Sequence, residues 1–297
     1  MTGRRVSHVH SKRGEQVARP SSLMRQITEA EAAQISEFDS VKSARERLDD
    51  IIQRLFDTSP QTNIALRVMQ AADDPNIDST QLATIIELDP FLALRVLRLA
   101  NTAYYGLQQH VSVVKAAVTV IGFSAVRSIA AMAAIGIGHT EIPPGFLAHS
   151  AKVAVGAAQC ARIFGEPAGD AFSGGLLHDI GEALLFRTDP VMWSAGQMSP
   201  NARAFEGAAF GMDHTTAGHL VMQAWRLPES LLGAVGRHHD PVAILPPLAR
   251  SIAVAEAVIL GDGELARSFG IDDDQIDDIA RQIDSDADSL QAWLQNG

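Results

Sequence analysis

GGLLHDIGEALL, residues 174–185, places a histidine and an aspartate side by side inside an apolar run with the composition of a helix. Burying an ionisable pair between Leu177 and Ile180 is costly unless each group finds a compensating partner. His178 and Asp179 are therefore either a hydrogen-bonded polar pair that packs in a core or part of a metal site. Both interpretations place this stretch in the interior of a helical domain.

The chain as a whole has the composition of an all-α protein. Its 297 residues are 46% hydrophobic but only 5% aromatic, so the core must consist mainly of Ala, Leu, Ile and Val, which suits helices. The long segments lack the alternation of apolar and polar residues that half-buried strands show. Asp89 before Pro90 predicts the start of a helix, and Gly122 is expected to interrupt the apolar stretch that surrounds it.

Breaks in these patterns divide the chain into parts. Pro143, Pro144 and Gly145 cannot lie inside a helix, so they separate two groups of helices. The expected parts are a disordered basic tail at 1–25, a helical extension at 26–60, a main domain at 61–262 with halves 61–140 and 141–262, and an acidic helical tail at 263–297. The apolar residues of the acidic tail recur at helical spacing, so we expect it to pack on the domain.

Charge and cysteine content restrict the partners and the compartment. The net charge of −11 argues against a nucleic-acid partner, because a phosphate-binding surface normally needs a basic stripe. The basic residues within 1–20 leave a nucleic-acid contact through this tail as a minor alternative. A single cysteine, Cys160, fits a reducing cytosol. The longest uncharged apolar stretch, 128–138, is far shorter than the ~20 residues that span a bilayer, so we expect a cytoplasmic protein without a membrane span.

Histidines and carboxylates gather in the second half of the chain. Beside expected helix ends or apolar helix faces lie His149, His178, His214, His238 and His239, and Asp179, Asp213 and Asp240 accompany them. Histidine with carboxylate is a typical ligand set for Zn, Fe, Mn or Co, and distant helices of a bundle can bring such residues together. The alternative is a set of hydrogen-bonded core histidines, and cationic histidines at 238–239 would also be favourable at a helix C-terminus.

Several motifs in a fixed order resemble the HDOD domain, the regulatory relative of the HD superfamily of metal-dependent phosphohydrolases. These motifs are IIELDPFLALRVLRLANTAYYG (85–106), VVKAAVTVIGFSAVRSIA (113–130), HSAKVA (149–154), GGLLHDIGEALL (174–185), DHTTAGHLVMQAWRLPESLLGAVGRHHDP (213–241) and IAVAEAV (252–258). The resemblance covers about 60–262. It implies the multi-helix HDOD fold, in which an N-terminal helical half packs on an HD-like half.

The resemblance also implies a set of metal ligands. The matching positions are His149, His178, Asp179, His214, His238, His239 and Glu256. The first three would bind one divalent ion (Fe, Mn, Zn, Ni or Mg), and the others would complete a second site. In HD enzymes such ions activate water and neutralise charge on a phosphoryl group. An active site of this kind would use Asp179.

Three departures from the HD enzymes weaken the catalytic interpretation. Glu182 stands where the phosphodiesterases often have lysine, and its carboxylate would repel a phosphodiester. Glu256 replaces the final aspartate and is longer by about 1.5 Å, whereas catalytic geometry is held to within about 0.5 Å. The Gly-Tyr-Pro motif of relatives that degrade cyclic di-GMP is absent from this sequence.

These observations favour a non-catalytic signalling module of bacterial signal transduction, with or without a bound metal. Its expected partners are other signalling proteins, which it would contact through its helical surface. The alternative is a metal-dependent phosphohydrolase or phosphodiesterase that acts on a nucleotide or a cyclic dinucleotide.

Overall fold

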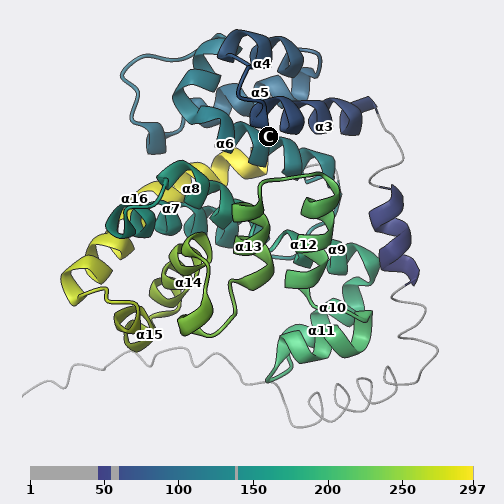
Figure 1. The fold of residues 1–297 in the computed structure, drawn as a ribbon, viewed down its shortest axis with the longest axis vertical. Coiled ribbons are helices and arrows are strands. Elements are labelled where there is room, and N and C mark those ends of the chain that lie inside the picture. Colours follow the sequence, from purple (N-terminus) through teal and green to yellow (C-terminus); the bar gives the residue numbers. More distant parts are fainter. Residues whose placement is uncertain (1–45, 55–59, 138–139, 297) are drawn as a thin grey trace, which may run out of the picture.

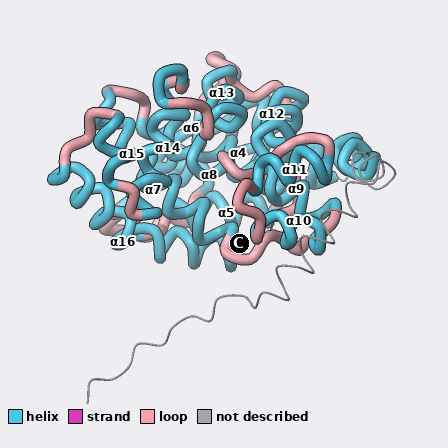
Figure 2. Tube along the Cα trace, turned by 90° about the horizontal axis from the view of Figure 1, so that it is seen from below, coloured by secondary structure: helices cyan, strands magenta, loops and turns pink. Residues whose placement is uncertain are grey.

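The computed structural model describes residues 46–54, 60–137 and 140–296. The expected basic tail at 1–25 and most of the expected extension at 26–60 lie outside the described residues. Within the described ranges every regular element is a helix, and the β structure is limited to an isolated bridge between Ile137 and Thr140. The all-α class is therefore confirmed (Figures 1 and 2).

The N-terminal half is a small layer of helices packed on one long helix. Its elements are α3 (Pro60–Asp73), α4 (Ser79–Ile86), α5 (Pro90–Ala100), the 3-10 turn η1 (Ala103–Tyr105) and α6 (Val114–Ala134). Helices α3, α4 and α5 all pack against α6 (Figure 1). The predicted start of α5 is confirmed, because the Asp89 carboxylate accepts hydrogen bonds from the backbone N–H groups of Phe91 and Leu92 and Pro90 is the first helical residue.

Helix α6 is the one described helix that is long and apolar enough to cross a membrane by length and composition. However, 61% of its apolar window is buried inside the protein. Gly122 has φ 79° and ψ 164°, so the predicted interruption is confirmed and the helix consists of two shorter pieces. Its burial beneath α3, α4 and α5 assigns α6 to the core of the N-terminal half.

The second half surrounds α7, which lies at the centre of its packing. Its elements are α7 (Phe146–Phe164), α8 (Ala168–Leu177), α9 (Ile180–Thr188), α10 (Pro190–Gln197), α11 (Ala202–Phe210), α12 (His214–Ala224), α13 (Glu229–Arg237), the 3-10 turn η2 (Val242–Ile244), α14 (Pro247–Leu260), α15 (Gly263–Ser268) and α16 (Asp273–Asn296). Helices α8, α14 and α16 pack directly on α7. Acidic α16 also reaches the first half, where Nε1 of Trp293 donates a hydrogen bond of 2.8 Å to the carbonyl oxygen of Arg95.

Two glycines of the opening motif bring helices of the second half into backbone contact. A Cβ atom on Gly175 would lie 2.7 Å from the carbonyl oxygen of Val153 in α7. A Cβ atom on Gly181 would overlap the carbonyl oxygen of His214 and lie 2.8 Å from the backbone nitrogen of Gly218, both in α12. The missing side chains therefore let α7 and α12 approach the segment that carries His178 and Asp179.

Candidate metal centre

The seven expected ligand residues come from separate helices of the second half, which the fold brings together. His149 lies on α7, His178 and Asp179 form the junction between α8 and α9, His214 begins α12, His238 and His239 follow α13, and Glu256 lies on α14. Side-chain nitrogen and oxygen atoms of these residues form overlapping groups in which all atoms lie within 4.8 Å of one another. They form a single cluster, which we call the centre.

Asp179 lies in the middle of the centre. Its Oδ2 atom is 2.9 Å from Nε2 of His178 and 3.5 Å from Nε2 of His149. Its Oδ1 atom is 3.5 Å from Nε2 of His238 and 3.6 Å from Nε2 of His214. The two oxygens of one carboxylate thus face two different groups of imidazoles.

The group on the Oδ2 side, His149, His178, Glu256 and Asp179, is the first half-site. The two Nε2 atoms of His149 and His178 are 3.2 Å apart, and Oε1 of Glu256 is 3.8 Å and 3.6 Å from them. Two ligand atoms that each lie about 2.1 Å from one ion are about 3.0–3.4 Å apart, so these spacings suit a single ion after small adjustments. Glu256 comes close to both imidazoles although it is longer than aspartate. The structure therefore places it at the first half-site, whereas the resemblance implied that it completes a second site.

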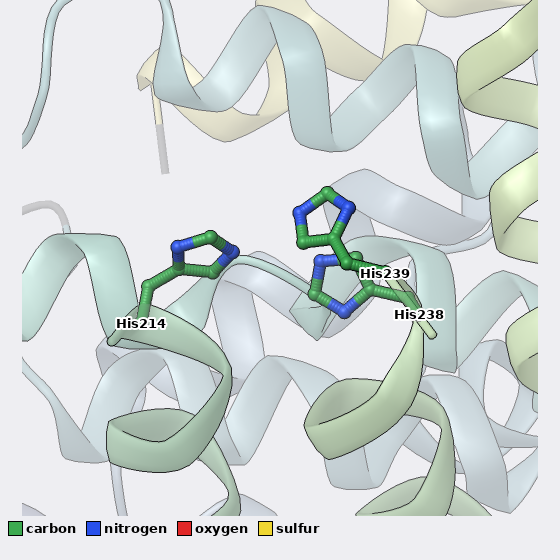
Figure 3. Close-up of side chains that lie close together, drawn as sticks. All are labelled: His214, His238 and His239. Carbon is green, nitrogen blue, oxygen red and sulfur yellow. The ribbon is translucent and has the colours of Figure 1, made fainter. Parts of the chain in front are cut away.

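The group on the Oδ1 side, His214, His238, His239 and Asp179, is the second half-site. Figure 3 shows the imidazole of His214 facing those of His238 and His239 across the gap between α12 and the end of α13. The ring centroid of His239 lies 5.3 Å from that of His214 and 4.1 Å from that of His238. His214 and His238 are buried, whereas His239 is exposed and forms the rim.

Hydrogen bonds at Nδ1 determine which nitrogen of the buried imidazoles faces Asp179. Nδ1 of His178 lies 2.8 Å from the carbonyl oxygen of Gly175, and Nδ1 of His238 lies 2.9 Å from that of Val235. A carbonyl oxygen only accepts, so Nδ1 carries the proton and Nε2 of the neutral ring presents a lone pair. Lone pairs that converge on a carboxylate repel one another unless a cation lies between them, and the bonds at Nδ1 are those that orient metal-binding histidines in proteins.

In the metal-free protein, protons on the imidazoles supply the positive charge that the carboxylates of the centre require. Burial alone would lower the pKa of His178, but Asp179 and Glu256 outweigh it and raise the pKa well above its ordinary value. Burial would also lower the pKa of His214, yet the bond to Glu206 and the charge of Asp179 raise it to about 9. Burial would raise the pKa of Asp179, but the surrounding histidines lower it well below its usual range. The arrangement therefore favours a cation, whether protons or a metal ion.

We expect metal affinity to increase between pH 6.5 and about 9, because His214 must lose its proton to bind an ion through Nε2. Each proton released should raise the affinity roughly tenfold per pH unit. The metal-free protein should show the opposite trend. Its stabilisation by charged His214 is complete below the ordinary pKa of 6.5 and is lost as pH rises through about 9. Chelator competition and thermal unfolding across this range check both trends, and a flat affinity profile would contradict the first.

Two glutamates near the second half-site were not among the predicted ligands. Glu206 on α11 is 1% exposed, and its Oε2 atom accepts a 2.9 Å hydrogen bond from the backbone N–H of His214 and lies 2.8 Å from Nδ1 of the same residue. Glu182 on α9 has a ligand-type atom within 4.8 Å of those of Glu206 and His214. Burial, together with the charges of Asp179 and Glu206, raises the pKa of Glu182 to about 8. A lone glutamate in a helix is usually solvated, so no local pattern indicated the role of Glu206.

Two aspartates that accompany the histidines in sequence have other partners. Asp213 caps α12 by accepting from the backbone N–H of Thr216, and it forms an ion pair of 2.8 Å with Arg203. Asp240 forms an ion pair of 2.8 Å with Arg237. These contacts explain both carboxylates without a metal.

Comparison with known proteins shows which proteins this chain is similar to. The HDOD domain model matches residues 59–241. A crystal structure of a candidate signal transduction protein from Marinobacter aquaeolei VT8 has a TM-score of 0.66 and 22% identity, and the match covers 89% of this chain and 68% of that one. A crystal structure of a candidate phosphohydrolase from Shewanella amazonensis SB2B has a TM-score of 0.60 and 22% identity, covering 83% and 92% of the two chains. At such identities the likeness shows a common fold.

A curated relative is an uncharacterized protein of Treponema pallidum (strain Nichols). It is 24% identical over an alignment 242 residues long, and the match covers 75% of this chain and 45% of the relative. The chain thus spans less than half the length of this relative.

Proposed function

The chain belongs to the HDOD domain family, and we propose that it is a metal-binding signalling module of that family that does not turn over a phosphodiester. The observation that carries the metal-binding part is the convergence of imidazole Nε2 atoms on both oxygens of Asp179. The signalling part is supported by the family and by the description of the Marinobacter structure. Other signalling proteins are the partners we propose.

The donor set fits a divalent transition metal. Imidazole nitrogens with carboxylate oxygens suit Fe, Mn, Zn or Ni better than Mg, which prefers oxygen ligands. His149, His178, Glu256 and Oδ2 of Asp179 would hold the first ion, and the second half-site would hold another. An ion bound there would supply positive charge and Lewis acidity at the solvent-facing rim.

Glu182 is the main argument against turnover. A phosphodiester that approached the second half-site would come near the carboxylate of Glu182, which has a ligand-type atom within 4.8 Å of one of His214. A bound cation favours the ionised form of Glu182, whose pKa is raised to about 8 without one, and the resulting negative charge offsets the attraction of the ion for an anionic substrate. A filled centre would therefore be closer to electrical neutrality than the same centre with lysine at position 182.

The phosphohydrolase alternative is favoured by one observation. The side chain of His149 is 36% exposed and His239 is exposed, so solvent reaches one ligand residue of each half-site. An open coordination position is what a catalytic metal site needs.

Metal analysis together with a substrate screen tests the proposal. The purified full chain is analysed by mass spectrometry for bound metal, then supplied with Mn, Fe, Ni or Zn and incubated with nucleotides, phosphomonoesters and cyclic dinucleotides. We expect up to two ions per chain and no turnover. Turnover that disappears in the His178→Ala/Asp179→Ala variant would replace the proposal with the phosphohydrolase alternative. A chain that binds no metal would contradict the metal-binding part.

Replacing Glu182 with lysine should increase the affinity of the metal-loaded protein for inorganic phosphate by about tenfold or more, because a negative charge near the bound anion becomes positive. Calorimetric titration with phosphate measures the change. Glu182→Gln should give an intermediate affinity. Glu264→Lys, the same charge change at an exposed position of α15, is the control and should leave the affinity as it is. Equal affinities of Glu182→Lys and the unmodified protein would show that Glu182 does not repel anions.

A further inference from the structure

One buried carboxylate makes two contacts with the same residue of the centre. Oε2 of Glu206 accepts from the backbone N–H of His214 at 2.9 Å and lies 2.8 Å from ring atom Nδ1. The two contacts fix both the start of α12 and the orientation of the imidazole that extends from it. Because the carboxylate accepts at Nδ1, the neutral ring keeps its proton there and presents Nε2 toward Asp179.

The burial of Glu206 is costly and is not explained by local packing. The residue is 1% exposed, and its second oxygen, Oε1, has no hydrogen-bond partner in the described part of the protein. Nε2 of His214 is likewise buried without a hydrogen-bond partner there. Buried charges are retained at a large desolvation cost, and this one lies directly behind an imidazole whose free nitrogen faces the second half-site. The pair has the geometry of the carboxylate and the histidine of a carboxylate–histidine–metal triad.

A purely structural role for Glu206 is the alternative. A carboxylate next to the first N–H groups of a helix is favourable through the helix dipole. However, Asp213 already caps α12 through the backbone N–H of Thr216, and a cap does not require contact with the ring. The bond to Nδ1 distinguishes the two roles, because only a positioning role predicts an effect on the atom at the other side of the imidazole.

We propose that Glu206 is a positioning residue. It holds the imidazole of His214 with the Nε2 lone pair facing the second half-site and thereby determines whether this half-site binds an ion. The inference rests on the proposed metal centre. The first half-site contains no contact with Glu206: its ligand atoms belong to His149, His178, Glu256 and Asp179. Glu206 therefore affects the second ion selectively.

Zinc titration of the full chain against a competing chromophoric chelator tests this inference. The unmodified protein should bind two Zn²⁺ ions. Glu206→Gln keeps the shape of the side chain but not its charge. It should lower the zinc affinity of the second half-site by about 10–100-fold, the usual effect of losing a residue that hydrogen-bonds to a ligand, and leave the zinc affinity of the first half-site unchanged. Glu206→Asp keeps the charge, but the shorter side chain cannot reach the imidazole of His214. It should therefore lower the zinc affinity of the second half-site by a similar factor. Glu264→Gln, at an exposed position of α15, is the matched control.

A second comparison separates positioning from helix capping. In a His214→Ala background, Glu206→Gln should cause no further loss of zinc affinity if it acts through the imidazole. A further loss of zinc affinity in the His214→Ala background would overturn the positioning role. An equal loss of zinc affinity at both half-sites would also overturn it. Two unchanged zinc affinities in Glu206→Gln and Glu206→Asp would also overturn it, and would leave the metal centre intact. An unmodified protein that binds no zinc would instead contradict the proposed function itself.

Discussion

Replacing Asp179 with asparagine is expected to abolish binding at both half-sites. Each carboxylate oxygen faces a different pair of Nε2 atoms, at 2.9 and 3.5 Å for Oδ2 and at 3.5 and 3.6 Å for Oδ1. Asparagine provides one oxygen, no charge and an amide that cannot coordinate through its NH₂ group. The affinity for each ion should fall at least about 100-fold, beyond the 10–100-fold that residues outside the coordination shell cause.

The same variant should also change the metal-free protein. Asp179 raises the pKa of His178 and of His214 in the metal-free protein. Removing the carboxylate leaves cationic imidazoles buried without their counter-ion, which is strongly destabilising. We therefore expect Asp179→Asn to unfold at a lower temperature at pH 7 and the difference to shrink as pH rises.

Asp240→Asn is the matched control for this experiment. Asp240 follows the same helix end as His238 and His239, but its carboxylate pairs with Arg237 at 2.8 Å on the surface. We expect normal zinc stoichiometry and at most a small change in stability, as is usual for an exposed ion pair. If Asp179→Asn still bound both ions with unmodified affinity, the central position of Asp179 in the centre would be wrong.

Gly181→Ala is expected to have the largest effect on folding. The new Cβ atom would overlap the carbonyl oxygen of His214 and lie 2.7 Å from its carbonyl carbon and 2.8 Å from the backbone nitrogen of Gly218. All three atoms belong to the backbone of α12, so no side-chain rotation relieves the clash. Overpacking commonly costs about 1–3 kcal/mol, and a clash with backbone should exceed this range.

The displacement should reach the metal centre as well. Helix α12 must move away from α9, and His214 at its first position moves with it. We expect the second zinc ion to be lost together with more than about 3 kcal/mol of unfolding free energy, which urea denaturation measures. Gly207→Ala in α11, where a Cβ atom meets nothing within 4 Å, should instead stabilise by about 0.4–1 kcal/mol. Equal stability of the two variants would show that α9 and α12 are not in backbone contact.

Local sequence patterns predicted the helices well, since each pattern acts over a few residues. The start of α5 at Asp89 and Pro90 and the interruption at Gly122 depend on capping bonds and on backbone conformations that the residues themselves favour. The expected ligands were identified differently, from the order of motifs in a known family. Nothing within GGLLHDIGEALL itself distinguishes a packed polar pair from a metal site.

The neighbours of the ligands could not be predicted. Asp213 and Asp240 stand beside histidines in sequence, yet the fold pairs them with Arg203 and Arg237. Glu206 stands in an unremarkable helix, yet the turn between α11 and α12 brings it against His214. Adjacent side chains point in different directions on a helix, so proximity in sequence does not indicate proximity in the site.

By itself, then, the sequence determined the all-helical class, the family and the identity of the histidines and carboxylates that belong to the centre. Only the tertiary structure decided that the oxygens of Asp179 face two separate half-sites, that Glu256 reaches the first, and that Glu206 supports the second. The physical reason is the distance along the chain over which the interactions act. Helix formation and capping depend on neighbours within one or two turns, whereas the centre depends on how closely α9 approaches α12, which the backbone contact at Gly181 sets.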